Sequence, residues 1–291
     1  LLVVIGHATY TTWTGDSGSI NLVTDNSCNI YVILCREIGK IGGWAYGFHM
    51  PLFFMLSGAL YSYSRSIVSF EKLILGKVRR LVIPFYLTGI LYMFPIKYFA
   101  GFYRKDTFVE AFQAFLFGGN SGHLWFLIAL FWCFVIFYPL EKYVFRRNIF
   151  CGMIIICFLF NWNLSGVLGD ISAINSVPGL ASAINYFPYF AGGYVLEKLR
   201  KKIQIHVSIK IIVTFILVGL STLQLEKYFF TNPTVTAVLG SISIYFVAYW
   251  ITNIPKITEM RVYKCLLKNS MYIYLFHDPL NFIMLRWAIN N

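Results

Sequence analysis

The sequence predicts an all-α fold, a polytopic membrane helix bundle in which about nine spans are visible. Two features of the composition favour it: hydrophobic residues make up 58% of the 291 residues, and charged residues only 12%. Typical soluble domains contain roughly 45–50% and about 25% of these residues, and a soluble globule this apolar could not cover its surface with polar groups. The third observation is that apolar residues gather in runs of the roughly 20 residues that cross a bilayer.

The runs follow one another along the whole chain, and each is expected to form a helix because lipid requires backbone groups to be satisfied internally. The predicted spans are residues 1–13, 47–64, 81–100, 123–141, 149–165, 182–197, 207–225, 234–252 and 269–289. Residues 30–46 mix apolar residues with Arg36, Glu37 and Lys40, which is typical of an interfacial amphipathic helix. The first run begins abruptly at Leu1, so we expect a span whose beginning is missing. With no repeat or linker in view, residues 1–291 are expected to form a single integral-membrane domain.

The formal net charge of +12 is explained by an unequal distribution of basic residues between the two sides of the membrane. If the first span runs outward, 17 of the 24 basic residues fall on the cytoplasmic side, as the positive-inside rule requires. These are Arg65, Lys72, Lys77, Arg79, Arg80, Lys142, Arg146, Arg147, Lys198, Arg200, Lys201, Lys202, Lys210, Lys256, Arg261, Lys264 and Lys268. We therefore expect no nucleic-acid partner, and a multi-pass protein with a cytoplasmic N-terminus. The six cysteines show no CxxC pair or metal-ligand spacing, so neither a disulfide scaffold nor a metal site is expected.

Four of the five histidines fall within or at the ends of predicted spans. His7 and His277 lie inside spans, whereas His49 and His123 lie near span ends. Ionisable groups in a membrane are functional candidates, and imidazole suits general base chemistry near neutral pH. The alternative is that these rings hydrogen-bond across helices and only tie the bundle together. His206 lies in a basic loop, where we expect it to be solvated.

Arg79 and Arg80 stand directly before the third predicted span. They are either ordinary positive-inside anchors or a site for phosphates, which guanidinium groups bind in bidentate fashion. Pro51 frees the carbonyl of Gly47 beside His49, which suits a kink or a backbone that lines a cavity. Ser57-Gly58 fits close helix packing better than a covalent acyl-enzyme.

Six segments in order resemble the acyltransferase-3 family of membrane acyltransferases. They are IGH (5–7), FHMPLFFMLSG (48–58), RRLVIPF (79–85), HLWFL (123–127), YFPYFAGG (186–193) and SMYIYLFH (270–277). The branch with FHMPLFF is similar to stand-alone sugar O-acetyltransferases of the fucose 4-O-acetylase type. The resemblance implies about ten spans. The Arg that precedes the family's catalytic His by eleven positions would fall before residue 1, and the family usually has one more span after the His277 helix. Both departures lead us to expect that the chain is trimmed at its ends.

The resemblance also implies acyl transfer from a cytosolic acyl-CoA, usually acetyl-CoA, to a hydroxyl of a cell-surface glycan or its lipid-linked precursor. Acetyl-CoA would be a donor substrate, with no permanently bound cofactor, and the location a bacterial plasma (inner) membrane. His7 matches the catalytic His and is the expected base. His49, His123 and His277 are candidates for orienting the acceptor or stabilising the oxyanion, and Arg79 and Arg80 for binding the CoA phosphates. The alternative from another class of protein is a transporter or flippase that exports a glycan or lipid-linked sugar. A further alternative within the same class, a peptidoglycan or antibiotic acyltransferase, would differ only in its acceptor.

Overall fold

Helices dominate the computed structural model, which describes residues 30–64, 69–101, 103, 107–161, 174, 176–202, 207–222 and 233–290. Within these ranges no β-strand occurs. Three helices are long and apolar enough to cross a membrane: Phe70–Phe99, Gly122–Phe145 and Pro233–Thr252. They correspond to the predicted spans 81–100, 123–141 and 234–252. The total of nine or ten spans stays a prediction, because the other described helices are too short or too polar to qualify by the same measure.

Two helices extend beyond the predicted spans that they contain. Residues 30–46 and 47–64 form one continuous helix, α2 (Ile30–Ser64), with Pro51 inside it. The helix that contains the third predicted span begins at Phe70, eleven residues before residue 81, so that Arg79 and Arg80 lie inside the helix. The buried side chains of Leu73 and Leu81 explain this extension, because they give residues 70–81 an apolar side that can pack on a neighbouring helix.

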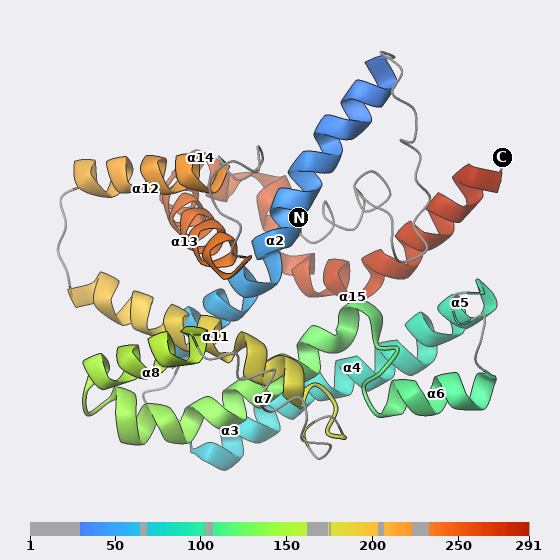
Figure 1. Cartoon of the computed structure of the whole chain (residues 1–291), viewed down its shortest axis with the longest axis horizontal. Coiled ribbons are helices and arrows are strands. Elements are labelled where there is room, and N and C mark those ends of the chain that lie inside the picture. The colour runs from blue at the N-terminus through green and yellow to red at the C-terminus, as the bar shows by residue number, and fades with distance from the viewer. Residues whose placement is uncertain are drawn as a thin grey trace. The chain divides into compact units, whose positions relative to one another are not determined.

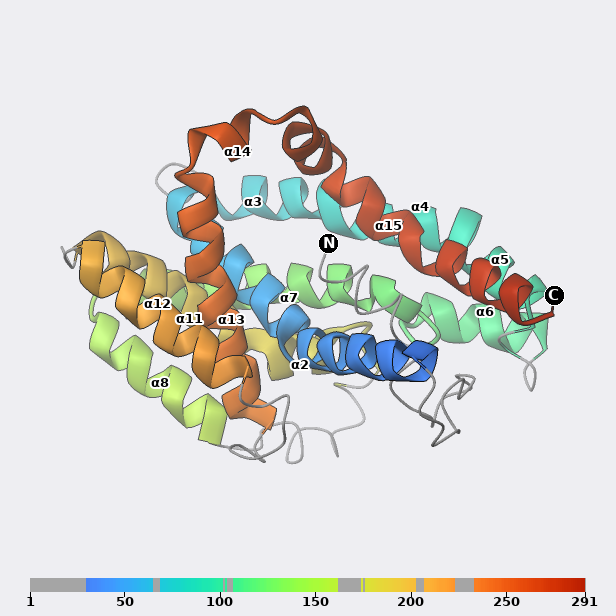
Figure 2. The same cartoon turned by 90° about the horizontal axis from the view of Figure 1, so that it is seen from above.

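The chain divides into two units, 1–52 with 205–291 and 53–204. In the first unit, α12 (Val207–Thr222) lies alongside α13 (Pro233–Thr252), as both views show (Figure 1; Figure 2). The short α14 (Pro255–Glu259) then leads to α15 (Arg261–Asn290). The first part of α2 is fixed to this unit by two hydrogen bonds, from Trp44 Nε1 to Ser221 O at 2.8 Å and from Ser241 Oγ to Phe48 O at 3.3 Å.

The second unit is built on α7 (Trp125–Leu140), which lies between the Phe70–Phe99 helix and α11 (Leu180–Lys202) (Figure 1). The other helices described in this unit are α6 (Phe108–Leu116), the 3-10 turn η5 (Gly122–Leu124), the π-helical η6 (Glu141–Phe145) and α8 (Ile149–Asn161). Aromatic rings fill the core around α7. Tyr61 of α2, for example, contacts Phe134 and Phe137 of α7 and Tyr194 of α11.

Two glycines let α2 and α11 approach at backbone distance. A Cβ added at Gly58 would overlap the carbonyl of Phe190, and one added at Gly193 would overlap the carbonyl of Met55. Ser57 Oγ donates to Phe53 O of its own helix at 2.8 Å. The prediction that Ser57-Gly58 serves close helix packing is therefore confirmed.

The Phe70–Phe99 helix is not a regular α-helix. It consists of α3 (Phe70–Lys77), η3 (Val78–Val82), α4 (Ile83–Thr88), η4 (Gly89–Met93) and α5 (Phe94–Phe99), in which η3 and η4 are π-helical. Each π-turn ends two residues before a proline, Pro84 or Pro95. A proline ring clashes with the carbonyl four residues before it, and a wider turn at that point lets the helix continue.

Candidate active site

His7, the expected base, lies outside the described residues, so its role stays a prediction. The other five predicted site residues are described. His49 and His277 belong to the first unit, and His123, Arg79 and Arg80 to the second. Among the described residues no group of three or more His, Cys, Asp or Glu side chains is placed to hold a metal ion.

His49 is buried on α2, with 3% of its surface exposed. Its Nδ1 lies 2.9 Å from the carbonyl oxygen of Tyr46. A carbonyl can only accept a hydrogen bond, so Nδ1 carries the proton and the Nε2 of the neutral ring carries the lone pair. In this tautomer His49 accepts a hydrogen bond through Nε2, which suits orienting a hydroxyl better than donating to an oxyanion.

His277 is held in the same way on α15. The ring is 8% exposed, and Nδ1 lies 2.8 Å from Tyr274 O and 3.1 Å from Ile273 O. Both partners are carbonyls, so Nδ1 is again the protonated nitrogen of the neutral ring. Two of the three described candidates thus share a tautomer that the sequence could not show, because the tautomer depends on which carbonyl each ring meets.

His123 is placed by a tight turn at the start of the Gly122–Phe145 helix. Gly118, Asn120 and Gly122 adopt positive φ angles of 83°, 43° and 51°, conformations that glycine and asparagine tolerate best. The turn is further fixed by a hydrogen bond from Tyr103 Oη to Asn120 O at 3.1 Å. His123 emerges from it 6% exposed. The same turn lies against the side chain of Lys97.

Arg79 and Arg80 occupy the π-helical η3, and both side chains are exposed. Neither guanidinium forms a hydrogen bond or ion pair within the part of the chain that the structure describes. The neighbouring ammonium of Lys77 instead lies 3.5 Å from the centre of the Phe134 ring, a cation–π contact. π-turns are frequent at functional sites, and this one presents two unpaired cations.

The surroundings of this pair follow from how its helix packs. Phe70 contacts Tyr138 of α7, Lys77 contacts Phe134, and Lys97 lies beside Gly122. The Phe70–Phe99 helix therefore runs antiparallel to the Gly122–Phe145 helix, and the η3 turn that carries Arg79 and Arg80 packs on α7. The two exposed guanidinium groups of this turn are available to an anionic ligand.

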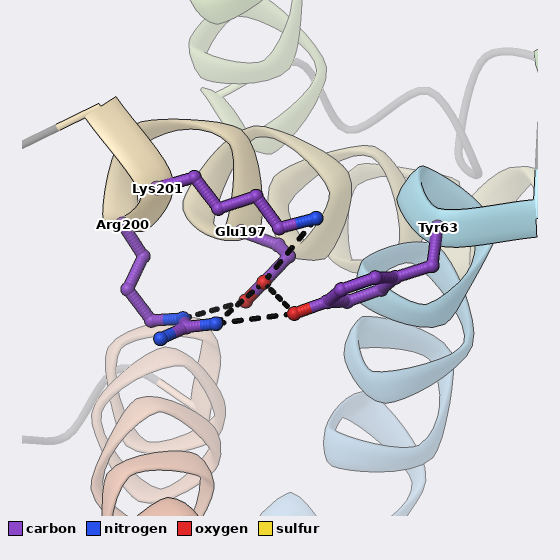
Figure 3. A network of polar contacts seen from close by, with 4 residues as sticks. All are labelled: Tyr63, Glu197, Arg200 and Lys201. Carbon is purple, nitrogen blue, oxygen red and sulfur yellow. Dashed lines mark hydrogen bonds and ion pairs between the residues drawn. The ribbon is translucent and has the colours of Figure 1, made fainter. Parts of the chain in front are cut away.

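Two buried carboxylates, which sequence reasoning missed, hold other cations of this unit. Glu197 is 1% exposed and accepts hydrogen bonds from Tyr63 Oη and from two nitrogens of Arg200, at 2.8 and 2.7 Å. Arg200 also donates to Tyr63 Oη at 3.1 Å, and Lys201 Nζ lies 3.9 Å from Glu197 (Figure 3). The network ties the end of α2 to the end of α11.

The second carboxylate, Glu141, is also 1% exposed. It accepts hydrogen bonds from Arg146 Nε at 2.9 Å and from Tyr194 Oη at 3.0 Å. The two carboxylates looked like ordinary loop charges because each stands among basic residues in the sequence. Arg146 and Arg200 each form an ion pair with one of these buried carboxylates. Arg79 and Arg80 form no such pair within the described residues.

Three apolar helices of membrane-spanning length, together with imidazoles that are buried in the described residues, define the class as an integral membrane protein. The acyltransferase-domain family model matches residues 1–291. The chain belongs to the acyltransferase-3 family and is a membrane acyltransferase, which confirms the family predicted from its six segments. Membership of this family gives no support to the transporter or flippase alternative. Among curated proteins and among solved structures no significant match is found.

Proposed function

We propose that the protein is an O-acyltransferase that moves an acyl group, in the first instance acetyl, from cytosolic acyl-CoA to a hydroxyl of a cell-surface glycan or its lipid-linked precursor. The observation that carries the proposal is the arginine pair. Arg79 and Arg80 are exposed and unpaired within the described residues, and they lie side by side in the π-helical η3, which packs on α7. The phosphates of coenzyme A supply the charge and the oxygen acceptors that two guanidinium groups bind best.

In the reaction, the acceptor hydroxyl oxygen attacks the thioester carbonyl carbon while His7 takes the hydroxyl proton. The tetrahedral intermediate collapses, the carbon–sulfur bond breaks, and the thiolate leaves with the proton that His7 returns. A positioned base contributes about 10²–10⁴-fold to such a step. His49 and His277 accept hydrogen bonds through Nε2 and orient the acceptor. We place the protein in a bacterial plasma membrane, with the donor entering from the cytosol.

Transfer of labelled acetyl from acetyl-CoA to glycan, in membranes that carry the protein, tests the proposal. Arg79→Ala with Arg80→Ala should raise the KM for acetyl-CoA at least about tenfold, since hydrogen bonds to charged groups contribute about 1.5–3 kcal/mol each. The matched control is Lys142→Ala with Arg147→Ala, which removes two exposed cations after α7 and should leave the KM unchanged.

His7→Ala should reduce the rate about 10²–10⁴-fold with the KM for acetyl-CoA retained. A rate at the wild-type level would remove His7 from the mechanism. Equal KM values for the arginine double variant and its control would show that the pair does not bind the donor. Acetyl-CoA that supports no transfer at all would overturn the proposed function itself.

A further inference from the structure

The chain between α13 and the apolar part of α15 has no role in the mechanism above. α13 ends at Thr252, α14 begins three residues later at Pro255, and α14 leads into α15 (Figure 2). The next predicted span begins at residue 269. Because α13 is long and apolar enough to cross a membrane, we place residues 253–268, here named the connecting segment, at the level of a membrane surface.

The connecting segment is strongly basic. Four basic residues and one acidic residue, Glu259, give it a formal charge of +3. All four cations are exposed, and none of them forms an ion pair with any residue that the structure describes. Their charge is therefore available to a partner outside the chain. The four are Lys256, Arg261, Lys264 and Lys268.

Three of these cations form a strip at the start of α15. Arg261, Lys264 and Lys268 are spaced by three and four residues, so they share one side of the first two turns of the helix. Val262 and Leu267 belong to the same two turns but fall outside the strip, and both side chains are exposed. These turns therefore present a basic side and apolar side chains to their surroundings at once.

Exposed apolar residues occur on other helices of the same unit, but without this strip of charge. On α12, Ile212, Phe215 and Ile216 are exposed, and residues 211–222 carry no charged side chain. Such a surface suits the acyl chains in the middle of a bilayer. The start of α15 has instead the pattern of a helix that lies in the interface, with apolar side chains among the upper acyl chains and cations at the level of the head groups.

We propose that the connecting segment is a docking site for anionic phospholipids, whose phosphate groups contact the strip formed by Arg261, Lys264 and Lys268. Charge complementarity identifies the occupant, because an anionic head group supplies the negative charge that the segment lacks and the acyl chains of the same molecule cover Val262 and Leu267. Basic residues directly beside a span attract the anionic lipids of the adjoining leaflet. This role goes beyond the proposed acyl transfer and uses none of its residues.

Titration of the purified full-length chain in detergent with phosphatidylglycerol and with phosphatidylcholine, followed by native mass spectrometry, tests the proposal. The test variant carries Arg261→Gln, Lys264→Gln and Lys268→Gln. It should bind phosphatidylglycerol at least about tenfold more weakly than the wild type, since each cation near an anionic surface contributes roughly fivefold. Its binding of phosphatidylcholine should not change.

The matched control carries Lys142→Gln, Arg147→Gln and Lys202→Gln, which remove the same number and kinds of exposed cations from the other unit. It should keep the wild-type affinity for phosphatidylglycerol. An equal loss in both triple variants would show that binding follows total charge and would overturn the proposal. Wild-type affinity in the test variant, or an equal loss for both lipids, would overturn it as well.

The native thiol of Cys265 reports on the same surface without any substitution. Cys265 is exposed beside the strip, and the exposed Cys151 of α8 is the reference thiol in the same molecules. The rates at which N-ethylmaleimide modifies the two thiols are measured by mass spectrometry of their peptides. We expect phosphatidylglycerol added to the micelle to slow the reaction at Cys265 and to leave Cys151 unchanged, with no such effect of phosphatidylcholine.

Equal rates at Cys265 with and without phosphatidylglycerol would contradict a lipid at this surface, even if the test variant does not fold. Protection of Cys265 that rises with protein concentration and not with lipid would indicate a second copy of the chain as the occupant, and would likewise overturn the proposal. Neither measurement uses acetyl-CoA, so these outcomes are independent of the transfer experiment.

Discussion

Removal of the Glu197 carboxylate should destabilise the second unit through the groups that it leaves behind. Glu197→Leu keeps a side chain of similar length in a site that is 1% exposed. It deprives Arg200 of two hydrogen bonds, at 2.8 and 2.7 Å, and Tyr63 Oη of its carboxylate acceptor. Figure 3 shows that these partners come from the ends of two helices, so the loss acts on the contact between α2 and α11.

The loss in the free energy of unfolding depends on how well the cations that Glu197 leaves behind can be rehydrated. Breaking a fully buried ion pair by removing one partner costs about 3–5 kcal/mol. The side chains of Arg200 and Lys201 are 22% and 41% exposed, so both cations regain part of their hydration, and we expect about 2–3 kcal/mol. In a protein of 291 residues that corresponds to a fall in Tm of about 3–5 °C.

The assay is thermal unfolding of the purified protein in detergent, carried out as a double-mutant cycle. Arg200→Leu alone should cost more than Glu197→Leu, because the buried carboxylate then loses both of its hydrogen bonds from the guanidinium group. The double variant should cost less than the sum of the two single variants by at least about 1 kcal/mol. Lys202→Ala, an exposed residue of the same turn, is the control and should not change Tm. A coupling energy below about 0.5 kcal/mol would refute the reasoning.

Three further predictions use neighbouring or paired positions. Gly193→Ala should prevent α11 from approaching α2 and lower Tm, whereas Gly192→Ala, with no atom within 4 Å of the added Cβ, should leave Tm unchanged or raise it; equal effects would contradict the close approach. Hydrogen bonds from the Thr107 backbone and side chain lower the pKa of Glu110 from its ordinary value of 4.5, so this cap stabilises helix α6 above that value and is lost as the pH falls through the lowered pKa. A carboxyl NMR titration should show the shift reduced, though not abolished, in the Thr107→Ala variant. His49→Gln, whose amide can stand in for Nε2, should retain more acetyl transfer than His49→Asn, whose amide replaces only Nδ1; the reverse order would show that Nδ1 is the important atom.

The buried imidazoles could be identified from sequence because a polar residue in an apolar run is conspicuous. His49, His123 and His277 were identified in this way, and all three are buried. Their tautomers could not be predicted, since these depend on contacts such as that between His49 Nδ1 and Tyr46 O. The π-helical form of the turn that carries Arg79, and its packing on α7, were likewise outside the reach of the sequence.

The missed residues are those for which sequence position suggests an ordinary role. Lys97 lies where a lysine usually reaches the interface, and only its contact with the Gly122 turn shows that it points inward. Glu141 and Glu197 each have basic neighbours in the sequence, which is typical of solvated loops. One signal was available for the π-turns, because Pro84 and Pro95 are eleven residues apart in a single span, and a helix that continues past a proline must widen or kink before it.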